Sequence, residues 1–337
     1  MIRLDEPLKL LNTFGLDVSS RLFFAFSAEE SLRSLWKTNL LQLTSPLVLG
    51  GGSNILFTRN YHGLILKNNI PGRELIKETS AHVWVRFGAG EPWQDCVQFA
   101  IANHWGGLEN LSLIPGSIGA APVQNIGAYG VELKDCFVEL SAFDLVSGKV
   151  RTFDQSDCAF GYRDSIFKRE GKGRYCILSV TLRLNKNHEF HTQYGDISTM
   201  LDSMGVKTLS IKAVSEAVMA IRRSKLPDPD VLGNCGSFFK NPVVDASHFE
   251  LLKKQFPDIR SFPAGEGKVK VPAGWLIEAD GWKGKRVGNT GCHQQQALVL
   301  VNYGGATGQE VADHAQRIVA SVEAHFGIRL ETEVNII

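Results

Sequence analysis

Ser237 stands in a segment that mixes turn, aromatic and polar residues densely, GNCGSFFKNP at residues 233–242. A nucleophilic serine of the hydrolase type needs a glycine two positions before it and another two positions after it. Cys235 and Phe239 occupy those positions here, which argues against a serine hydrolase. Two interpretations remain: a serine in a structural turn, or a hydroxyl that donates a hydrogen bond or a proton to a ligand.

Arg163 has apolar neighbours on both sides, in FGYRDSIFK at residues 160–168. This context predicts a partly buried guanidinium, which requires a negatively charged partner. The partner could be Asp164, another carboxylate of the protein, or a substrate carboxylate held by two parallel hydrogen bonds. A second basic group at residues 222–225 is first interpreted as a helix end favoured by the helix dipole, although a diphosphate could bind the same cluster.

No charged residue or histidine occurs in residues 110–131, between Glu109 and Glu132. Prolines and glycines interrupt this segment throughout, so a membrane-spanning helix of about 20 apolar residues is excluded. Its small residues let backbone groups approach a ligand closely, and the absence of charge favours a flat, mostly apolar ligand. The segment alone leaves two interpretations open, a cradle for an organic cofactor and a buried loop that packs between two sheets.

A run of glycines at residues 50–52 joins two short predicted strands, residues 47–49 and 55–57. A dinucleotide site of the Rossmann type requires a helix directly after its glycines, so this order does not match that fingerprint. The loop could still form a nest of backbone N–H groups for a phosphate, with Ser53 and Asn54 as further donors. Taken alone, the pattern favours a plain hairpin turn.

The composition excludes a general affinity for nucleic acid or membranes. Lys plus Arg number 36 and Asp plus Glu number 35, so the formal charge is +1 and no basic field is present. The six cysteines include no Cys-x-x-Cys pair, and we expect no metal site. Asp5 and Glu6 stand where a secretory signal needs an apolar run, so we expect a cytoplasmic protein with reduced thiols.

Helices and strands are both predicted in the first two thirds of the chain. Ser27, as an N-cap, predicts a helix that continues to about residue 40. Alternating apolar residues predict strands near residues 83–87 and 178–184. Between them, a helix is predicted over residues 92–105.

The last third of the chain is predicted to form a separate domain. A helix over residues 210–225 ends at a break with two prolines, residues 226–229, where we place the domain boundary. A long amphipathic helix is predicted over residues 308–326, closed by Gly327. The alternation in residues 330–336 predicts a final strand.

Taken together, these segments resemble the UDP-N-acetylenolpyruvoylglucosamine reductases, also called UDP-N-acetylmuramate dehydrogenases. These are flavoproteins of peptidoglycan precursor synthesis, and the resemblance is to type I of the family. It covers nearly the whole chain. The motifs that carry it are residues 12–14, 49–54, 114–130, 160–168, 194–196, 225–229, 236–242, 293–300 and 330–334.

The resemblance implies an α+β fold with two parts. The first is a two-lobed FAD-binding module of the vanillyl-alcohol-oxidase (PCMH) type, and the second is a C-terminal α/β substrate-binding domain. The expected bounds are residues 1–68 for the first lobe, joined by the C-terminal strand 329–337, then 69–226 for the second lobe and 227–328 for the substrate-binding domain.

The resemblance also assigns binding residues. The glycine loop would hold the FAD pyrophosphate, which reverses the local preference for a plain turn, and the uncharged segment would lie along the flavin. Tyr194 and Lys225 would contact the phosphates of a UDP-sugar, with Asn241 and Gln296 as further substrate contacts. The implied FAD-binding residues are Gly50, Gly51, Gly52, Ser53, Asn54, Ile114, Pro115, Gly116, Ser117, Gly119, Ala120, Gln124, Asn125, Gly127, Ala128, Tyr129 and Gly130.

The implied reaction has two halves that share one site. NADPH reduces FAD, NADP leaves, and the enolpyruvyl ether of UDP-N-acetylglucosamine then receives a hydride from the flavin and a proton. By motif position, Ser237 gives the proton to the carbon next to the carboxylate, while Arg163 and Glu333 stabilise the enediolate-like intermediate. The product is UDP-N-acetylmuramate, and we expect the enzyme to act as a monomer.

The role of Glu333 carries an electrostatic condition. An ionised carboxylate about 4 Å from the intermediate would cost about 4 kcal/mol at an effective dielectric constant of about 20. That repulsion is comparable with the roughly 3 to 4 kcal/mol that a good oxyanion donor contributes. We therefore predict that Glu333 is protonated when it acts, with a pKa above the value of about 4.3 for free Glu.

The sequence departs from the family pattern at a few positions. Thr332 replaces the usual proline before Glu333, and Asn335 replaces an arginine. These two changes concern how Glu333 is held rather than which residue acts. Cys235 stands where alanine is common, and we assign it no catalytic role.

Two other functions remain open. One is another flavin enzyme of the same fold that oxidises an alcohol with oxygen, which would not need Ser237, Arg163 and Glu333 together. The other is a nucleotide-sugar binding protein without redox chemistry, in which the uncharged segment would be structural. The visible absorbance of a bound flavin would distinguish the redox functions from the last.

Overall fold

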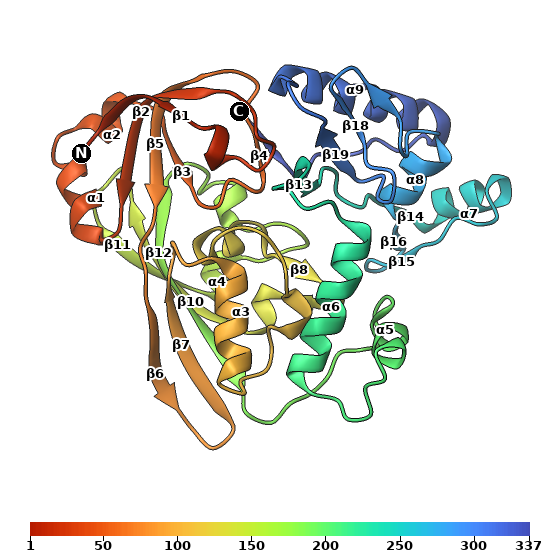
Figure 1. Ribbon diagram of the computed structural model, residues 1–337, viewed down its shortest axis with the longest axis horizontal. Coiled ribbons are helices and arrows are strands. Elements are labelled where there is room, and N and C mark those ends of the chain that lie inside the picture. Colours follow the sequence, from red (N-terminus) through yellow and green to blue (C-terminus); the bar gives the residue numbers. More distant parts are fainter. The chain divides into compact units, whose positions relative to one another are not determined.

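The chain folds into two compact units, which the computed structural model describes over residues 1–337 (Figure 1). The first unit comprises Met1–Glu6, Ser20–Gly52 and His62–Ser224. The second comprises Pro7–Ser19, Ser53–Tyr61 and Lys225–Ile337. The three-part division expected from the family resemblance stays a prediction. Each helix is too short or too polar to span a membrane.

The first unit contains a four-stranded sheet in the order β1-β2-β5-β3. Its strands are β1 (Arg3–Pro7), β2 (Ser19–Phe26), β5 (Tyr61–Asn68) and β3 (Pro46–Leu49). β3 and β5 are parallel and pair Leu49 with Lys67. The glycine loop leaves the carboxyl end of β3, so it begins at an edge where two parallel strands end together.

Two short helices, α1 (Glu29–Trp36) and α2 (Leu40–Leu43), connect β2 to β3. The predicted N-cap, Ser27, is wrong, because Ala28 occupies the cap position and no side chain caps the helix. Glu29 and Glu30 lie in the first turn instead, and their negative charges favour the positive end of the helix dipole. Acidic residues therefore stabilise the N-terminus of α1, where the sequence predicted a serine hydroxyl as the cap.

A five-stranded antiparallel sheet, in the order β11-β10-β12-β7-β6, forms the larger part of the first unit. The predicted strands are confirmed in β7 and β12, and the apolar positions Val83, Val85 and Phe87 are buried. The strands are β6 (Arg73–Glu78), β7 (His82–Gly88), β10 (Phe137–Asp144), β11 (Val150–Asp154) and β12 (Tyr175–Asn185).

Helices and short 3₁₀ turns accompany this sheet. The helix predicted over residues 92–105 is α3, which is shorter than predicted and ends at Ala102, before Trp105. The helix predicted over residues 210–225 is α6, whose apolar face packs against α5. The elements are α3 (Trp93–Ala102), η2 (Glu109–Leu111), η3 (Ile118–Gln124), β8 (Gly127–Ala128), β9 (Val131–Glu132), η4 (Leu133–Asp135), α4 (Gln155–Cys158), η5 (Ile166–Lys168), α5 (Ile197–Ser203) and α6 (Ile211–Lys225).

The second unit combines small sheets with three helices around one core. The predicted helix α9 (Gly308–Phe326) begins with a reciprocal cap between Thr307 and Glu310 and ends at Gly327, which has a φ of 64°. The other elements are η1 (Lys9–Leu11), β4 (Ile55–Leu56), β13 (Gly233–Ser237), β14 (Val243–Asp245), α7 (Ala246–Gln255), β15 (Phe262–Pro263), β16 (Lys268–Lys270), α8 (Ala273–Ala279), β17 (Arg286–Val287), β18 (Thr290–Cys292), β19 (Val299–Asn302) and β20 (Asn335–Ile336).

The strand predicted over residues 330–336 is wrong in extent. Only β20, Asn335–Ile336, pairs as a strand, in parallel with β4. Thr332 forms a single antiparallel bridge to Phe239. The segment changes partners between these two contacts, so it cannot form one continuous ladder.

Candidate active site

Two of the segments predicted to bind the cofactor pack against each other in the first unit. A Cβ atom added to Gly51 would lie 2.7 Å from the Cα of Gly116, and one added to Gly50 would overlap the Ser117 hydroxyl. Gly52 and Gly116 also have positive φ angles, 68° and 120°. The two loops therefore meet backbone to backbone, which only glycine permits.

The uncharged segment both packs and remains accessible. Ile118 and Ala121 are buried in the core of the first unit, whereas Pro115, Ala120 and Gly130 are exposed. The two interpretations left open by the sequence are thus compatible, because one side of the segment fills the core while the other presents backbone to solvent.

Asn125 is a structural anchor within this segment. It is buried, with a φ of 43°, and its Nδ2 atom donates to Glu132 (3.0 Å) and to the carbonyl of Gly161 (3.1 Å). Its Oδ1 atom accepts from the N–H of Lys134 at 3.0 Å. Because these bonds use both ends of the amide, we expect any cofactor contact here to come from the backbone.

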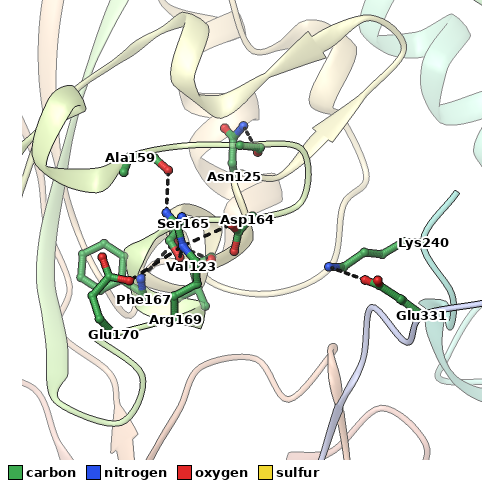
Figure 2. A network of polar contacts seen from close by, with 11 residues as sticks. Val123, Asn125, Ala159, Asp164, Ser165, Phe167, Arg169, Glu170, Lys240 and Glu331 are labelled. Carbon is green, nitrogen blue, oxygen red and sulfur yellow. Dashed lines mark hydrogen bonds and ion pairs between the residues drawn. The ribbon is translucent and has the colours of Figure 1, made fainter. Parts of the chain in front are cut away.

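Arg163 lies on a tight turn that Asn125 helps to fix. Gly161 and Asp164 bridge across the turn, and Arg163 itself has a φ of 53°. Figure 2 shows the surrounding network, in which the Ser165 hydroxyl donates to the carbonyl of Val123 at 2.7 Å. Arg169 extends this network, since its Nη2 atom donates to the carbonyl of Ala159 at 3.0 Å.

The guanidinium of Arg163 reaches back to the uncharged segment. Its Nη2 atom donates to the carbonyl of Gly127 at 2.5 Å. Asp164 is not its partner, because that carboxylate lies 3.3 Å from Arg169 instead. The structure therefore overturns the first of the three possibilities that the sequence left open for Arg163.

Arg222 belongs to the basic group that the sequence interpreted as a helix end, with a diphosphate as an alternative ligand. Its Nε atom donates to the carbonyl of Leu113 at 3.1 Å, which places this α6 residue on the uncharged segment. It forms no ion pair with a carboxylate. Burial lowers the pKa of Arg222; nearby Tyr129 opposes that shift and the positive charge of Arg163 adds to it. Both arginines therefore donate to backbone carbonyls of the uncharged segment, Arg163 to Gly127 and Arg222 to Leu113.

Tyr194, which is predicted to bind substrate, lies against the uncharged segment at Gly130. A Cβ atom added to Gly130 would lie 3.4 Å from the Cβ of Tyr194, and one added to Gly195 would lie 3.5 Å from the ring of Tyr129. Tyr194 is 46% exposed. The first unit therefore brings together Tyr194 and the end of the uncharged segment.

Ser237 ends β13 after an irregularity in the strand pairing. Asn234 builds that irregularity, because its Oδ1 atom accepts from the N–H of Gly236 at 2.9 Å while its Nδ2 atom donates to the carbonyl of Leu232 at 2.8 Å. The next two residues, Phe238 and Phe239, are buried in the core of the second unit. Ser237 itself is half-buried, and the buried residues that follow it fix the position of its backbone.

Glu333 is held beside the Ser237 segment by strand-like hydrogen bonds. The N–H of Glu333 donates to the carbonyl of Phe238 at 2.8 Å, and the N–H of Lys240 donates to the carbonyl of Glu331 at 2.9 Å. Neither bond uses the N–H of Thr332, so the proline usual at that position would leave both intact. The Lys240–Glu331 ion pair, drawn in Figure 2, adds a contact at 3.6 Å.

The end of the glycine loop joins this group in the second unit. The Nδ2 atom of Asn54 donates to the carbonyl of Glu333 at 3.4 Å. Asn335, the second departure from the family pattern, donates from its side chain to the carbonyl of Asn54 at 3.1 Å. Ser53 and Asn54 thus lie in the second unit, whereas Gly50, Gly51 and Gly52 lie in the first.

Two predicted substrate residues meet at the start of α8. The Oδ1 atom of Asn241 accepts from the N–H of Ala273 at 2.9 Å, and Gln296 packs over Gly274. The Nδ2 atom of Asn241 donates to no group of the protein, so it remains available to donate to a ligand. Lys225 is exposed at the end of α6.

The cysteines do not contribute reactive thiols. All six are buried and unpaired. Burial, with the charge of Glu333 as a smaller cause, raises the pKa of Cys235 well above its ordinary value. Burial likewise raises to about 12 the pKa of Cys96, Cys136, Cys158, Cys176 and Cys292.

Known proteins match both parts of this arrangement. Residues 228–337 match the family described as UDP-N-acetylenolpyruvoylglucosamine reductase, C-terminal domain, and residues 21–154 match the family described as FAD binding domain. The UDP-N-acetylenolpyruvoylglucosamine reductase of Flavobacterium johnsoniae is 49% identical over 337 residues, which covers 100% of this chain and 99% of that protein. The chain belongs to the UDP-N-acetylenolpyruvoylglucosamine reductase family.

Other members of the UDP-N-acetylenolpyruvoylglucosamine reductase family give the same result. The reductase of Amoebophilus asiaticus is 48% identical and covers 98% of both chains. That of Pseudomonas aeruginosa is 49% identical and covers 98% of this chain and 97% of its own. The family predicted from sequence motifs is therefore confirmed.

Solved structures confirm the expected fold. The UDP-N-acetylenolpyruvylglucosamine reductase of Thermus caldophilus has a TM-score of 0.68 at 22% identity and covers 100% of this chain and 98% of its own. The 4-ethylphenol oxidase of Gulosibacter chungangensis has a TM-score of 0.50 at 11% identity and covers 99% of this chain and 86% of its own. These likenesses concern the fold alone.

Proposed function

We propose that this protein reduces the enolpyruvyl ether of UDP-N-acetylglucosamine to UDP-N-acetylmuramate, with FAD as bound cofactor and NADPH as hydride donor. The observation that carries the proposal is the 49% identity to a named reductase over the full length of both chains. The reaction is a step of peptidoglycan precursor synthesis, and we place it in the cytoplasm, with the enzyme acting as a monomer.

The residues of the first unit fit an FAD molecule. The loops at Gly51 and Gly116 meet so closely that a Cβ atom would fill the space between them, and the neighbouring segment carries no charge. Such a surface suits a flat ring next to an anionic linker, with backbone N–H groups as donors. When bound, FAD would carry hydride equivalents from NADPH to the enolpyruvyl double bond.

The second unit supplies polar groups for the sugar nucleotide. Asn241 keeps its Nδ2 donor available beside Gln296, and both are fixed at the start of α8. We assign these two residues to the nucleotide-sugar substrate. Lys225 and Tyr194 would contact its diphosphate, because an ammonium and a phenol can both donate hydrogen bonds to phosphate oxygens.

The catalytic roles follow from donor type and charge. Ser237 would give the proton to the carbon next to the substrate carboxylate, since its hydroxyl stands on a rigid strand end. Arg163 would hold the negative charge that develops on that carboxylate, because a guanidinium is always charged and can bind it bidentately. Glu333, in its protonated form, would donate a hydrogen bond to the same group of atoms.

Arg222 strengthens this assignment. Arg222 forms no ion pair with a carboxylate, and its guanidinium is held on the uncharged segment through the carbonyl of Leu113. We propose that the positive charge of Arg222 stabilises the negative charge of the bound reactants.

Anaerobic spectroscopy tests the proposed function. Purified protein should absorb visible light as a flavoprotein does, NADPH should bleach that absorbance, and the enolpyruvyl sugar nucleotide should restore it. A colourless protein that cannot be reconstituted with FAD would rule out the redox function. Restoration by oxygen but not by the enolpyruvyl compound would indicate an oxidase of the same fold.

A further inference from the structure

Lys67 occupies an unusual position beside the glycine loop. It lies near the carboxyl end of β5 and pairs with Leu49, the last residue of the parallel strand β3 before the loop. Its neighbours Leu66 and Asn68 are buried, and the Nδ2 atom of Asn68 donates to the carbonyl of Ile177 at 2.7 Å. The strand end that carries Lys67 is therefore fixed in the first unit.

The ammonium of Lys67 has one hydrogen-bond partner, the carbonyl of Gly50. It forms no ion pair with a carboxylate, although the residue is half-buried. Burial lowers the pKa of Lys67 below its ordinary value. A partly buried charge without a counter-ion is unfavourable, so the fold retains a cation here that a bound anion would stabilise.

The hydrogen bond from Lys67 to the carbonyl of Gly50 also fixes the direction of the N–H of Gly51, because both groups belong to one peptide. A trans peptide directs its C=O and N–H groups to opposite sides, so the N–H of Gly51 points away from the ammonium. That N–H donates to no group of the protein, and Gly51 is exposed. The Lys67 ammonium also polarises the peptide, which makes the N–H a stronger donor.

The packing of the loop confines the peptide between Gly50 and Gly51. A Cβ atom added to Gly50 would overlap the Ser117 hydroxyl, and one added to Gly51 would lie 2.7 Å from the Cα of Gly116. Backbone this closely confined keeps one orientation only while its carbonyl is satisfied. Lys67 is the group that satisfies it.

We propose that Lys67 is a positioning residue for a bound diphosphate: it orients the Gly50–Gly51 peptide so that the N–H of Gly51 faces the pyrophosphate of FAD. The proposal rests on the FAD-binding function proposed above. A diphosphate also occurs in the sugar nucleotide, but Lys67 and the glycine loop lie within residues 21–154, which match the FAD binding domain, so we assign this site to the cofactor.

The test measures flavin binding to protein from which flavin has been removed. Lys67→Met keeps the length of the side chain and removes its charge. We expect it to weaken FAD binding about ten- to a hundredfold, as the loss of a charge-assisted hydrogen bond predicts. Riboflavin, which lacks the diphosphate, should bind both proteins equally. Lys67→Arg should restore most of the affinity, and the affinity of Lys67→Met should depend less on salt.

Lys149→Met is the matched control, because Lys149 is an exposed lysine of the same unit. Unchanged FAD affinity in Lys67→Met would overturn the proposal, and so would equal losses for FAD and riboflavin, which would indicate a collapsed loop. Weaker binding of UDP-N-acetylglucosamine with FAD unaffected would assign the contact to the substrate and also overturn it. Wild-type protein that binds no FAD would instead contradict the proposed function.

Discussion

The proposed role of Ser237 as a proton donor can be tested separately from substrate binding. Its hydroxyl stands at the end of β13, between the irregularity built by Asn234 and the buried Phe238. Neither of these supports uses the hydroxyl, so Ser237→Ala should leave the fold intact. A general acid contributes about 10²- to 10⁴-fold to rate, and its loss should slow only the step that needs a proton.

Stopped-flow absorbance of Ser237→Ala under anaerobic conditions measures that expectation. NADPH should bleach the flavin at the wild-type rate, while the enolpyruvyl sugar nucleotide should restore the colour at least about a hundredfold more slowly. Loss of both steps would show structural damage and remove the support for a proton donor.

Glu333 should make the second half-reaction depend on pH. We predict a pKa above that of free Glu, because only the protonated carboxyl avoids repulsion with the developing negative charge. The rate should then fall as pH rises through the pKa of Glu333, whereas Glu333→Gln, which is always neutral, should lose that limb. An identical pH profile in both proteins would show that Glu333 does not act in this way.

Among the elements, the 3₁₀ helix η3 and the turn that carries Arg163 depend on each other through Asn125. Asn125→Ala would leave the N–H of Lys134 without its partner in a partly buried place, and it would remove one of the two hydrogen bonds that the carbonyl of Gly161 accepts. We expect a loss of about 2 to 4 kcal/mol in unfolding free energy and a further loss of turnover, because the Arg163 turn loosens.

Asn39→Ala is the matched control for this prediction. Asn39 also has a positive φ, 60°, but it is exposed and its side chain does not cap the helix that follows. The control should lose only about 1 kcal/mol, the cost of a left-handed backbone without glycine or asparagine. Urea unfolding of both variants gives the comparison, and equal losses would show that the Asn125 network contributes nothing.

Helix α9 places a buried histidine where acid should destabilise the protein. His314 is 1% exposed, and its Nδ1 atom has no partner. Burial, with the charges of Arg317 and Lys285, lowers its pKa from 6.5 to about 4. The unfolded chain binds a proton below about pH 6.5 while the folded chain does not, so stability should fall by about 3 kcal/mol between pH 6.5 and 4.

Urea unfolding at several pH values measures this effect. His314→Leu should flatten the decline between pH 6.5 and 4, because Leu does not titrate, whereas the exposed His62→Leu should leave it unchanged. If His314→Leu shows the same decline as the wild type, other groups cause the acid sensitivity.

Sequence periodicity predicted the long elements well and the local supports poorly. Helix α9 was predicted with its closing Gly327, because its stripe and its end are encoded within neighbouring residues. The contact of Arg222 with Leu113 joins residues 109 positions apart, so no local pattern reveals it. The motifs predicted catalytic roles for Arg163 and Ser237, which stay predictions, and the hydrogen bonds of Asn125 and Asn234 near them appear only in the folded chain.

At the scale of the whole molecule, the N-terminal third of the chain contributes to both units. Phe14, Leu16 and Leu56 are almost fully buried in the core of the second unit, together with side chains from α9 and β18. Residues on both sides of the break at Pro227 therefore share the core of the second unit, and the break does not mark the boundary of that core.

A fragment that ends at residue 226 tests this interdependence. It would expose Phe14, Leu16 and Leu56, because the residues that bury them follow the break. We expect the fragment to aggregate or to unfold without a cooperative transition, since each exposed side chain forfeits about 1.5 to 3 kcal/mol of burial. The same fragment with these three residues changed to Ser should be more soluble. A soluble monomeric fragment with a sharp urea transition and native FAD affinity would show that the first unit folds alone.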